Sequence, residues 1–97
     1  MKLLNYLSRF FFSTKYRARR EAMDEHDKIL TRIRFAITMP RIYDLQDEVL
    51  DYHNTWASII DYETLDILVG SLWAAIYKRE AAVQSERKRA YTKTMYN

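Results

Sequence analysis

The stretch LDILVGSLWAAIY, residues 65–77, decides the fold, because it is the only run of this chain that is apolar on nearly every side of a helix. It contains one charge, Asp66, followed by eleven uncharged residues from Ile67 to Tyr77. A helix that crosses a bilayer needs about 20 apolar residues. The stretch is therefore too short to span a membrane, and we expect it to form a helix in the core of a protein.

The helix predicted around this stretch has two unlike faces. One face carries Gly70, Ala74 and Ala81, and such small residues allow another backbone to approach closely. This small face would therefore let a second helix approach closely. The opposite, bulky face consists of Leu65, Leu68, Val69, Leu72, Trp73 and Ile76.

Length and composition favour a single helical domain. The chain has 97 residues, of which 48% are apolar and 14% aromatic, enough for one modest core. It contains only one glycine and one proline, too few for the turns of a many-stranded β protein. We expect one all-α domain over residues 1–97, a compact bundle of three or four helices with a central apolar helix around residues 62–83.

Apolar residues at helical spacing predict further helices before the central one. Residues 1–20 are expected to form a basic amphipathic helix that begins near residue 2. Residues 21–38 and residues 41–56 carry longer apolar stripes, and these two helices are expected to pack on the central one. Residues 84–97 form a basic, polar C-terminal extension of the last helix. The apolar stripe of the first helix consists of Leu3, Leu4, Leu7, Phe10 and Phe11.

Two breaks separate these helices. Pro40 lacks the backbone donor that a continuing helix needs, so the helix over residues 21–38 ends or kinks there. A second break falls between Asn54 and Asp61, where Ser58 or Asp61 is suited to cap the next helix. The phase of the apolar stripe changes across both breaks, which indicates turns rather than one long helix.

Charge is segregated along the chain. Residues 1–20 carry six basic and no acidic side chains, residues 21–77 carry four basic and eleven acidic ones, and residues 78–97 carry six basic and two acidic ones. The three segments therefore have net charges of +6, −7 and +4. Basic ends around an acidic middle either pair with that middle, in the same or a neighbouring chain, or bind phosphate or an anionic surface. Pairing is the interpretation we favour.

Several residues are candidate contacts for a partner. Phe12, Tyr16 and Phe35 lie off the apolar stripes, so a lone bundle leaves them partly exposed. Four carboxylates recur on one face of the helix over residues 41–56 and form a candidate acidic docking face: Asp44, Asp47, Glu48 and Asp51. The basic candidates for contacts with a partner or with phosphate are Arg17, Arg19, Arg20, Arg87, Lys88 and Arg89.

The sequence does not indicate catalysis or metal binding. It contains no cysteine, and none of the glycine-rich phosphate loops, nucleophile elbows or HExxH pairs of common enzymes. The residues three positions before His26 and His53 are Met23 and Leu50, whereas a di-metal bundle has glutamates there. We expect no enzyme activity, no cofactor and no metal, and we interpret both histidines as core residues that are hydrogen-bonded to a neighbour.

The predicted function is that of a non-enzymatic protein–protein interaction module, cytoplasmic, which docks helical surfaces on a protein partner or on copies of itself. Small size and the lack of motifs are typical of an accessory or inhibitor protein of a phage or mobile element, or of a small subunit of an assembly. One alternative is a nucleic-acid-binding protein that uses the basic N- and C-terminal ends. Another is a peripheral membrane or mitochondrial subunit anchored by residues 1–20.

Overall fold

Three helices make up the described residues of this protein in a computed structural model, which describes the backbone from Lys2 to Tyr96 and the side chains of residues 16–89. They are α1 (Lys2–Arg34), α2 (Met39–Trp56) and α3 (Tyr62–Tyr96). All three contact one another, and the described residues contain no strand. The expected all-α bundle with a central helix is confirmed, with three helices rather than four.

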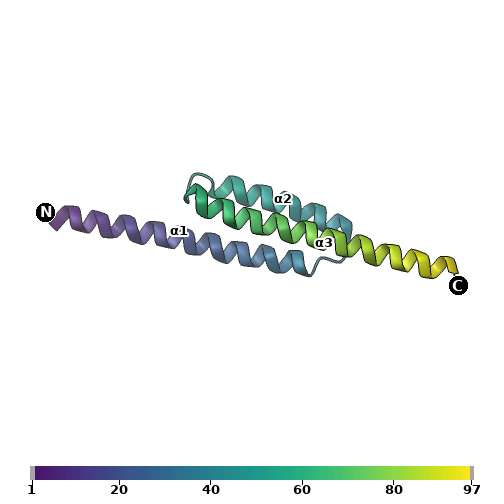
Figure 1. The fold of residues 1–97 in the computed structure, drawn as a ribbon. Coiled ribbons are helices and arrows are strands. Elements are labelled where there is room, and N and C mark those ends of the chain that lie inside the picture. The colour runs from purple at the N-terminus through teal and green to yellow at the C-terminus, as the bar shows by residue number, and fades with distance from the viewer. Residues whose placement is uncertain (1, 97) are drawn as a thin grey trace.

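The three helices overlap only in the middle of the molecule (Figure 1). α1 and α3 run in the same direction and α2 runs antiparallel to both, so that the first half of α1 projects from one end and the last part of α3 from the other. The molecule measures 80 × 17 × 17 Å, and its radius of gyration of 19.5 Å exceeds the roughly 13 Å of a compact 100-residue domain. Only the middle of the chain is therefore a compact bundle.

One apolar core joins the three helices. α3 has the most extensive contacts and packs against both α1 and α2. The stripe predicted for residues 41–56 is buried as expected, and burial of such apolar surface is the main force that holds the helices together. The core consists of Ala22, Ile29, Ile33, Ala36, Ile42, Leu45, Val49, Tyr52, Trp56, Ile60, Leu65, Leu72, Ile76 and Val83.

α1 joins two helices that the sequence predicts separately, and it ends earlier than predicted. One continuous helix includes both the basic segment and the stripe predicted over residues 21–38, and it ends at Arg34 instead of residue 38. The early end has a local cause, because Thr38 has an extended backbone (φ −129°, ψ 151°) and its hydroxyl accepts from the backbone N–H of Arg41. A residue that caps the start of α2 is not available to extend α1.

Asp61, one of the two predicted caps, begins α3. Its Oδ2 accepts hydrogen bonds from the Thr64 hydroxyl at 2.6 Å and from the Thr64 backbone N–H at 3.0 Å. These two bonds, together with the positive charge of Arg19, lower the pKa of the Asp61 carboxyl below its usual range. The other carboxylate oxygen lies 3.0 Å from Arg19 Nη2, so the cap also connects α3 to α1.

The small face of α3 is open to solvent. Gly70, Ala74 and Ala81 are all exposed, and a Cβ added at Gly70 would meet no atom of the described chain within 4 Å. Large apolar neighbours share this exposure, since Ile67 is 72% and Tyr77 is 64% exposed. The close approach of a second helix that these small residues allow is not made by α1 or α2, because both lie against the bulky side.

Replacing Gly70 with alanine is expected to stabilise the protein by about 0.5–1 kcal/mol, because alanine restricts the unfolded chain and its methyl group meets no obstruction. Urea denaturation of the wild-type protein and of Gly70→Ala measures the change in the free energy of unfolding. The matched control is Ala74→Gly, one turn along the same exposed face, which should lose a similar amount. A loss of stability in Gly70→Ala would show that another surface covers this position.

Candidate functional site

The four residues of the predicted acidic docking face lie in two different environments. Asp44, Asp47 and Asp51 are exposed on the side of α2 that faces away from the core, and no cation among the described side chains forms an ion pair with them. Glu48 differs, because its Oε1 lies 2.8 Å from Nη1 of Arg32 on α1. Glu48 therefore has a role inside the bundle, and the three aspartates remain available to a partner.

An apolar rib runs beside these aspartates on α2. Tyr43 and Leu50 are 54% and 51% exposed. They lie on the same side of the helix, because two positions separated by two turns nearly superpose along the helix axis. We name the five residues that share this surface the α2 outer face: Tyr43, Asp44, Asp47, Leu50 and Asp51.

The two basic clusters of the sequence lie toward opposite ends of the molecule (Figure 1). Arg17 and Arg20 are exposed on α1, close to the point where this helix leaves the bundle. Arg19 between them pairs instead with Asp61 at the start of α3. The structure therefore does not bring the two clusters together. The second cluster consists of Arg87, Lys88 and Arg89, which are exposed on α3 beyond the core.

The aromatic candidates for partner contacts are exposed where the structure describes them. Phe12 lies outside the residues whose side chains are described. Tyr16 is 68% exposed on α1, and Phe35 is 76% exposed in the turn that follows α1. Because both side chains are exposed, Tyr16 and Phe35 remain candidate contacts.

The segment after Phe35 borders a groove of about 600 Å³ between residues 37–40 and α3, and Arg87 is one of the residues that line it.

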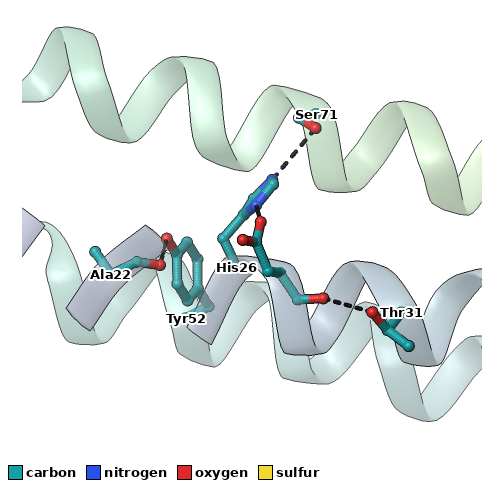
Figure 2. Close-up of polar contacts among 6 residues, drawn as sticks. Ala22, His26, Thr31, Tyr52 and Ser71 are labelled. Carbon is teal, nitrogen blue, oxygen red and sulfur yellow. Dashed lines mark hydrogen bonds and ion pairs between the residues drawn. The ribbon is translucent and has the colours of Figure 1, made fainter. Parts of the chain in front are cut away.

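His26 is a buried polar residue between α1 and α3 (Figure 2). Its Nδ1 lies 3.0 Å from Asp27 Oδ1, and its Nε2 lies 3.3 Å from the Ser71 hydroxyl. A carboxylate only accepts hydrogen bonds, so in the neutral ring Nδ1 carries the proton and Nε2 accepts from Ser71. The expected hydrogen-bonded core histidine is confirmed for His26.

The expectation that His53 is also a core residue is wrong. It is exposed on α2, because its position falls beside the buried stripe of that helix rather than on it. The two histidines therefore lie in different environments, one buried and one in solvent. Among the described side chains, no group of three histidine, aspartate or glutamate residues gathers in a way that would hold a metal ion.

Two aromatic side chains of α2 make polar contacts with α1. The Tyr52 hydroxyl donates to the Ala22 carbonyl at 2.7 Å (Figure 2), and Trp56 Nε1–H donates to Glu25 Oε2 at 2.9 Å. Burial raises the pKa of Tyr52 to about 12, with smaller contributions from the negative charges of Glu25 and Asp27. These contacts hold one side of α2 against α1, which leaves the α2 outer face directed away from the bundle.

A groove between α1 and α3 contains three cations whose proximity the sequence does not reveal. It has a volume of about 340 Å³, and Arg34, Lys78 and Arg79 line it. Arg79 is the least exposed of the three, and its Nε donates to the Ala36 carbonyl at 2.5 Å. The one signal in the sequence is that Arg79 occupies a position where the apolar stripe of α3 continues. Nothing in the local pattern connects it with Arg34.

Comparisons of the chain with protein-family models, with curated proteins and with solved structures found no match in any of the three. None of the described helices is both long enough and apolar enough to span a membrane. The surfaces of the bundle are therefore the basis on which a function is inferred.

Proposed function

We propose that this protein is a non-enzymatic interaction module that associates with copies of itself, with the N-terminal segment of one copy docked on the α2 outer face of another. The observation that carries the proposal is the α2 outer face itself. It combines two half-exposed apolar side chains with three carboxylates that have no cationic partner among the described side chains. A surface of this composition suits an amphipathic helix that is apolar on one side and basic at its borders.

The N-terminal segment of the chain has the required chemistry. Residues 1–20 contain six basic and no acidic residues, and their apolar residues follow helical spacing. This segment is the first part of α1, which projects from the end of the bundle (Figure 1). Opposite charges on the two surfaces favour their encounter, and like charges oppose the pairing of two N-terminal segments.

Within one chain these two surfaces lie apart. α1 is one continuous helix over Lys2–Arg34, and α2 packs beside its second half, where Tyr52 contacts Ala22 and Trp56 contacts Glu25. The α2 outer face is on the opposite side of α2 from these contacts. The first half of α1 therefore extends away from α2, and a second copy is a partner that carries both complementary surfaces.

Docking of this kind joins two different surfaces. Two copies that dock reciprocally form a closed dimer, whereas docking in one direction builds a ring or an open chain. Either assembly depends on attraction between exposed charges, which salt screens with a Debye length of about 8 Å at physiological ionic strength. We therefore expect an oligomer whose mass falls as salt is added.

Light scattering after size exclusion, which gives absolute mass in solution, tests this proposal. With nucleic acid removed, we expect the wild-type protein to be oligomeric at low salt and to dissociate at high salt. The triple variant Asp44→Asn, Asp47→Asn and Asp51→Asn should be monomeric at low salt, because it removes the carboxylates of the α2 outer face. Leu50→Ala, which keeps every charge, should weaken the association by removing apolar contact area.

The matched control removes three carboxylates from exposed positions outside the α2 outer face: Asp24→Asn, Glu63→Gln and Asp66→Asn. This variant has the same net charge as the test variant and should remain oligomeric at low salt. A wild-type protein that is monomeric at low salt would contradict the proposal. Equal dissociation of the two triple variants would also contradict it, because net charge alone would then explain the effect.

A further inference from the structure

The groove between α1 and α3 is a second surface, separate from the α2 outer face. We propose that this groove binds a phosphate-bearing ligand through Arg34, Lys78 and Arg79. Three features support the proposal: three cations converge on one groove, none of the described residues that line it is a carboxylate, and a hydrogen bond holds Arg79 in place. It is independent of whether the protein associates with itself.

Among the described side chains, the three cations of the groove have no negatively charged partner. Arg34 belongs to the last turn of α1, and Lys78 and Arg79 belong to α3, so two helices contribute to the site. No described carboxylate forms an ion pair with any of the three. Other arginines beside helix interfaces are paired, as Arg19 and Arg32 are. The groove therefore holds positive charge that an anion can neutralise.

Arg79 is held in place by the segment that connects α1 to α2. Its Nε donates to the Ala36 carbonyl, and its Nη1 and Nη2 make no hydrogen bond with the described residues. A guanidinium that is already held through one nitrogen loses less conformational freedom when its other nitrogens bind an anion.

The dimensions of the groove suit a small anionic group. Its volume of about 340 Å³ lies at the lower end of the range of ligand sites, about 300–1,000 Å³. Ala75 and Ala82 line one wall, and their short side chains leave room between the two helices. Ser71 also lines the groove, but its proton is directed to His26 Nε2 in the neutral ring, so we assign anion binding to the cations.

Phosphate matches this arrangement better than a single carboxylate does. A phosphate monoester or a diphosphate carries more than one negative charge and offers several oxygen acceptors, so it can contact a lysine and two arginines together. Such a group belongs either to a small phosphorylated molecule or to the backbone of a nucleic-acid strand. A small molecule engages the groove alone, whereas a strand also engages exposed basic residues outside it.

NMR of the backbone amides of isotope-labelled protein, titrated with pyrophosphate at constant ionic strength, tests the site. We expect saturable shifts confined to the groove, at the amides of Ser71, Ala75, Lys78 and Ala82. General attraction between charges would instead shift the amides of every basic segment without saturation. That second pattern would overturn the proposal.

A pair of double variants tests which cations are responsible. Arg34→Gln with Lys78→Gln should weaken pyrophosphate binding by about tenfold or more, because two charge-assisted contacts are lost. Arg79 is left unchanged because it also donates a hydrogen bond to the Ala36 carbonyl, between α1 and α2. The matched control, Lys28→Gln with Arg41→Gln, removes two exposed cations outside the groove and should change the affinity by less than about twofold. Equal weakening in both variants would overturn the proposal.

A single-stranded oligonucleotide used in place of pyrophosphate distinguishes the two sources of phosphate. Groove shifts with the oligonucleotide, lost in the groove variant, assign the site to a nucleic-acid backbone. Groove shifts with pyrophosphate alone assign it to a small phosphorylated molecule. An absence of groove shifts with both probes overturns the proposal. If the groove variant is monomeric at low salt while its control remains oligomeric, the groove is a contact between copies, and the proposal is also overturned.

Discussion

Replacing Leu72 with alanine is expected to lower the free energy of unfolding by about 2–5 kcal/mol. Leu72 is fully buried on α3, and the core to which it belongs receives side chains from all three helices. Truncation removes apolar surface that folding buries and leaves a cavity that the helices can close only in part. A domain is typically stable by only about 5–15 kcal/mol, so this single change would remove a large part of the total.

Urea denaturation at high salt, where we expect single chains, measures this loss without a contribution from association. The matched control is Ile67→Ala on the open side of the same helix, where the side chain is 72% exposed. That variant should change the free energy of unfolding by less than about 0.5 kcal/mol. A loss below about 1 kcal/mol in Leu72→Ala would mean that α3 is not at the centre of the core.

Replacing Tyr52 with phenylalanine is expected to reverse the order of stability between neutral and strongly alkaline pH. Folding raises the pKa of Tyr52 from 10.0 to about 12, so the folded protein holds this proton more tightly than the unfolded chain does. The resulting stabilisation is fully present below about pH 10 and is lost as the pH rises through about 12. At about 1.4 kcal/mol for each pKa unit, the wild-type protein loses about 2–3 kcal/mol across this window.

The phenylalanine variant lacks the titrating group and does not lose this part of its stability. At about pH 9 it should be less stable than the wild type by about 1 kcal/mol, because the hydrogen bond from the Tyr52 hydroxyl to the Ala22 carbonyl is gone. Near pH 12 the wild type should be the less stable of the two, by about 1–2 kcal/mol. Urea denaturation as a function of pH measures both differences, and lysines and other tyrosines titrate equally in both proteins.

The control for the alkaline effect is Tyr62→Phe. Tyr62 is 77% exposed at the start of α3, so its removal should leave the pH dependence of stability close to that of the wild type. If the Tyr52→Phe variant and the wild type instead lose stability in parallel between about pH 10 and 12, the Tyr52 hydroxyl is not buried as described.

Much of the local structure can be predicted from the sequence. Pro40 lies in the first turn of α2, as its missing N–H predicts, and Asp61 caps α3 through the backbone N–H of Thr64. The 3,4 spacing along α2 identifies its buried stripe from Ile42 to Trp56. These features depend on residues a few positions apart, so a short window of sequence contains the information that determines them.

The candidate surfaces depend on more than local pattern. Asp44 and Glu48 look equivalent in the sequence, but only Glu48 reaches a cation of α1, at 2.8 Å. Arg19 and Arg20 are adjacent, yet only Arg19 pairs with Asp61. Which member of a cluster is used inside the bundle depends on how each helix is rotated about its axis, and that rotation is decided by the packing of side chains between helices.

By itself the sequence determined the helical class, the buried stripe of α2 and the two breaks, at Pro40 and before Asp61, because spacing and backbone chemistry act within one helix. Only the tertiary structure decided how far α1 and α3 are displaced along each other, and therefore that Arg34 and Lys78 share a groove. It also decided that Gly70 faces solvent, since α1 and α2 both cover the bulky side of α3. The physical reason is that helix displacement and rotation arise from contacts between residues far apart in the chain, which the periodicity of a single helix does not encode.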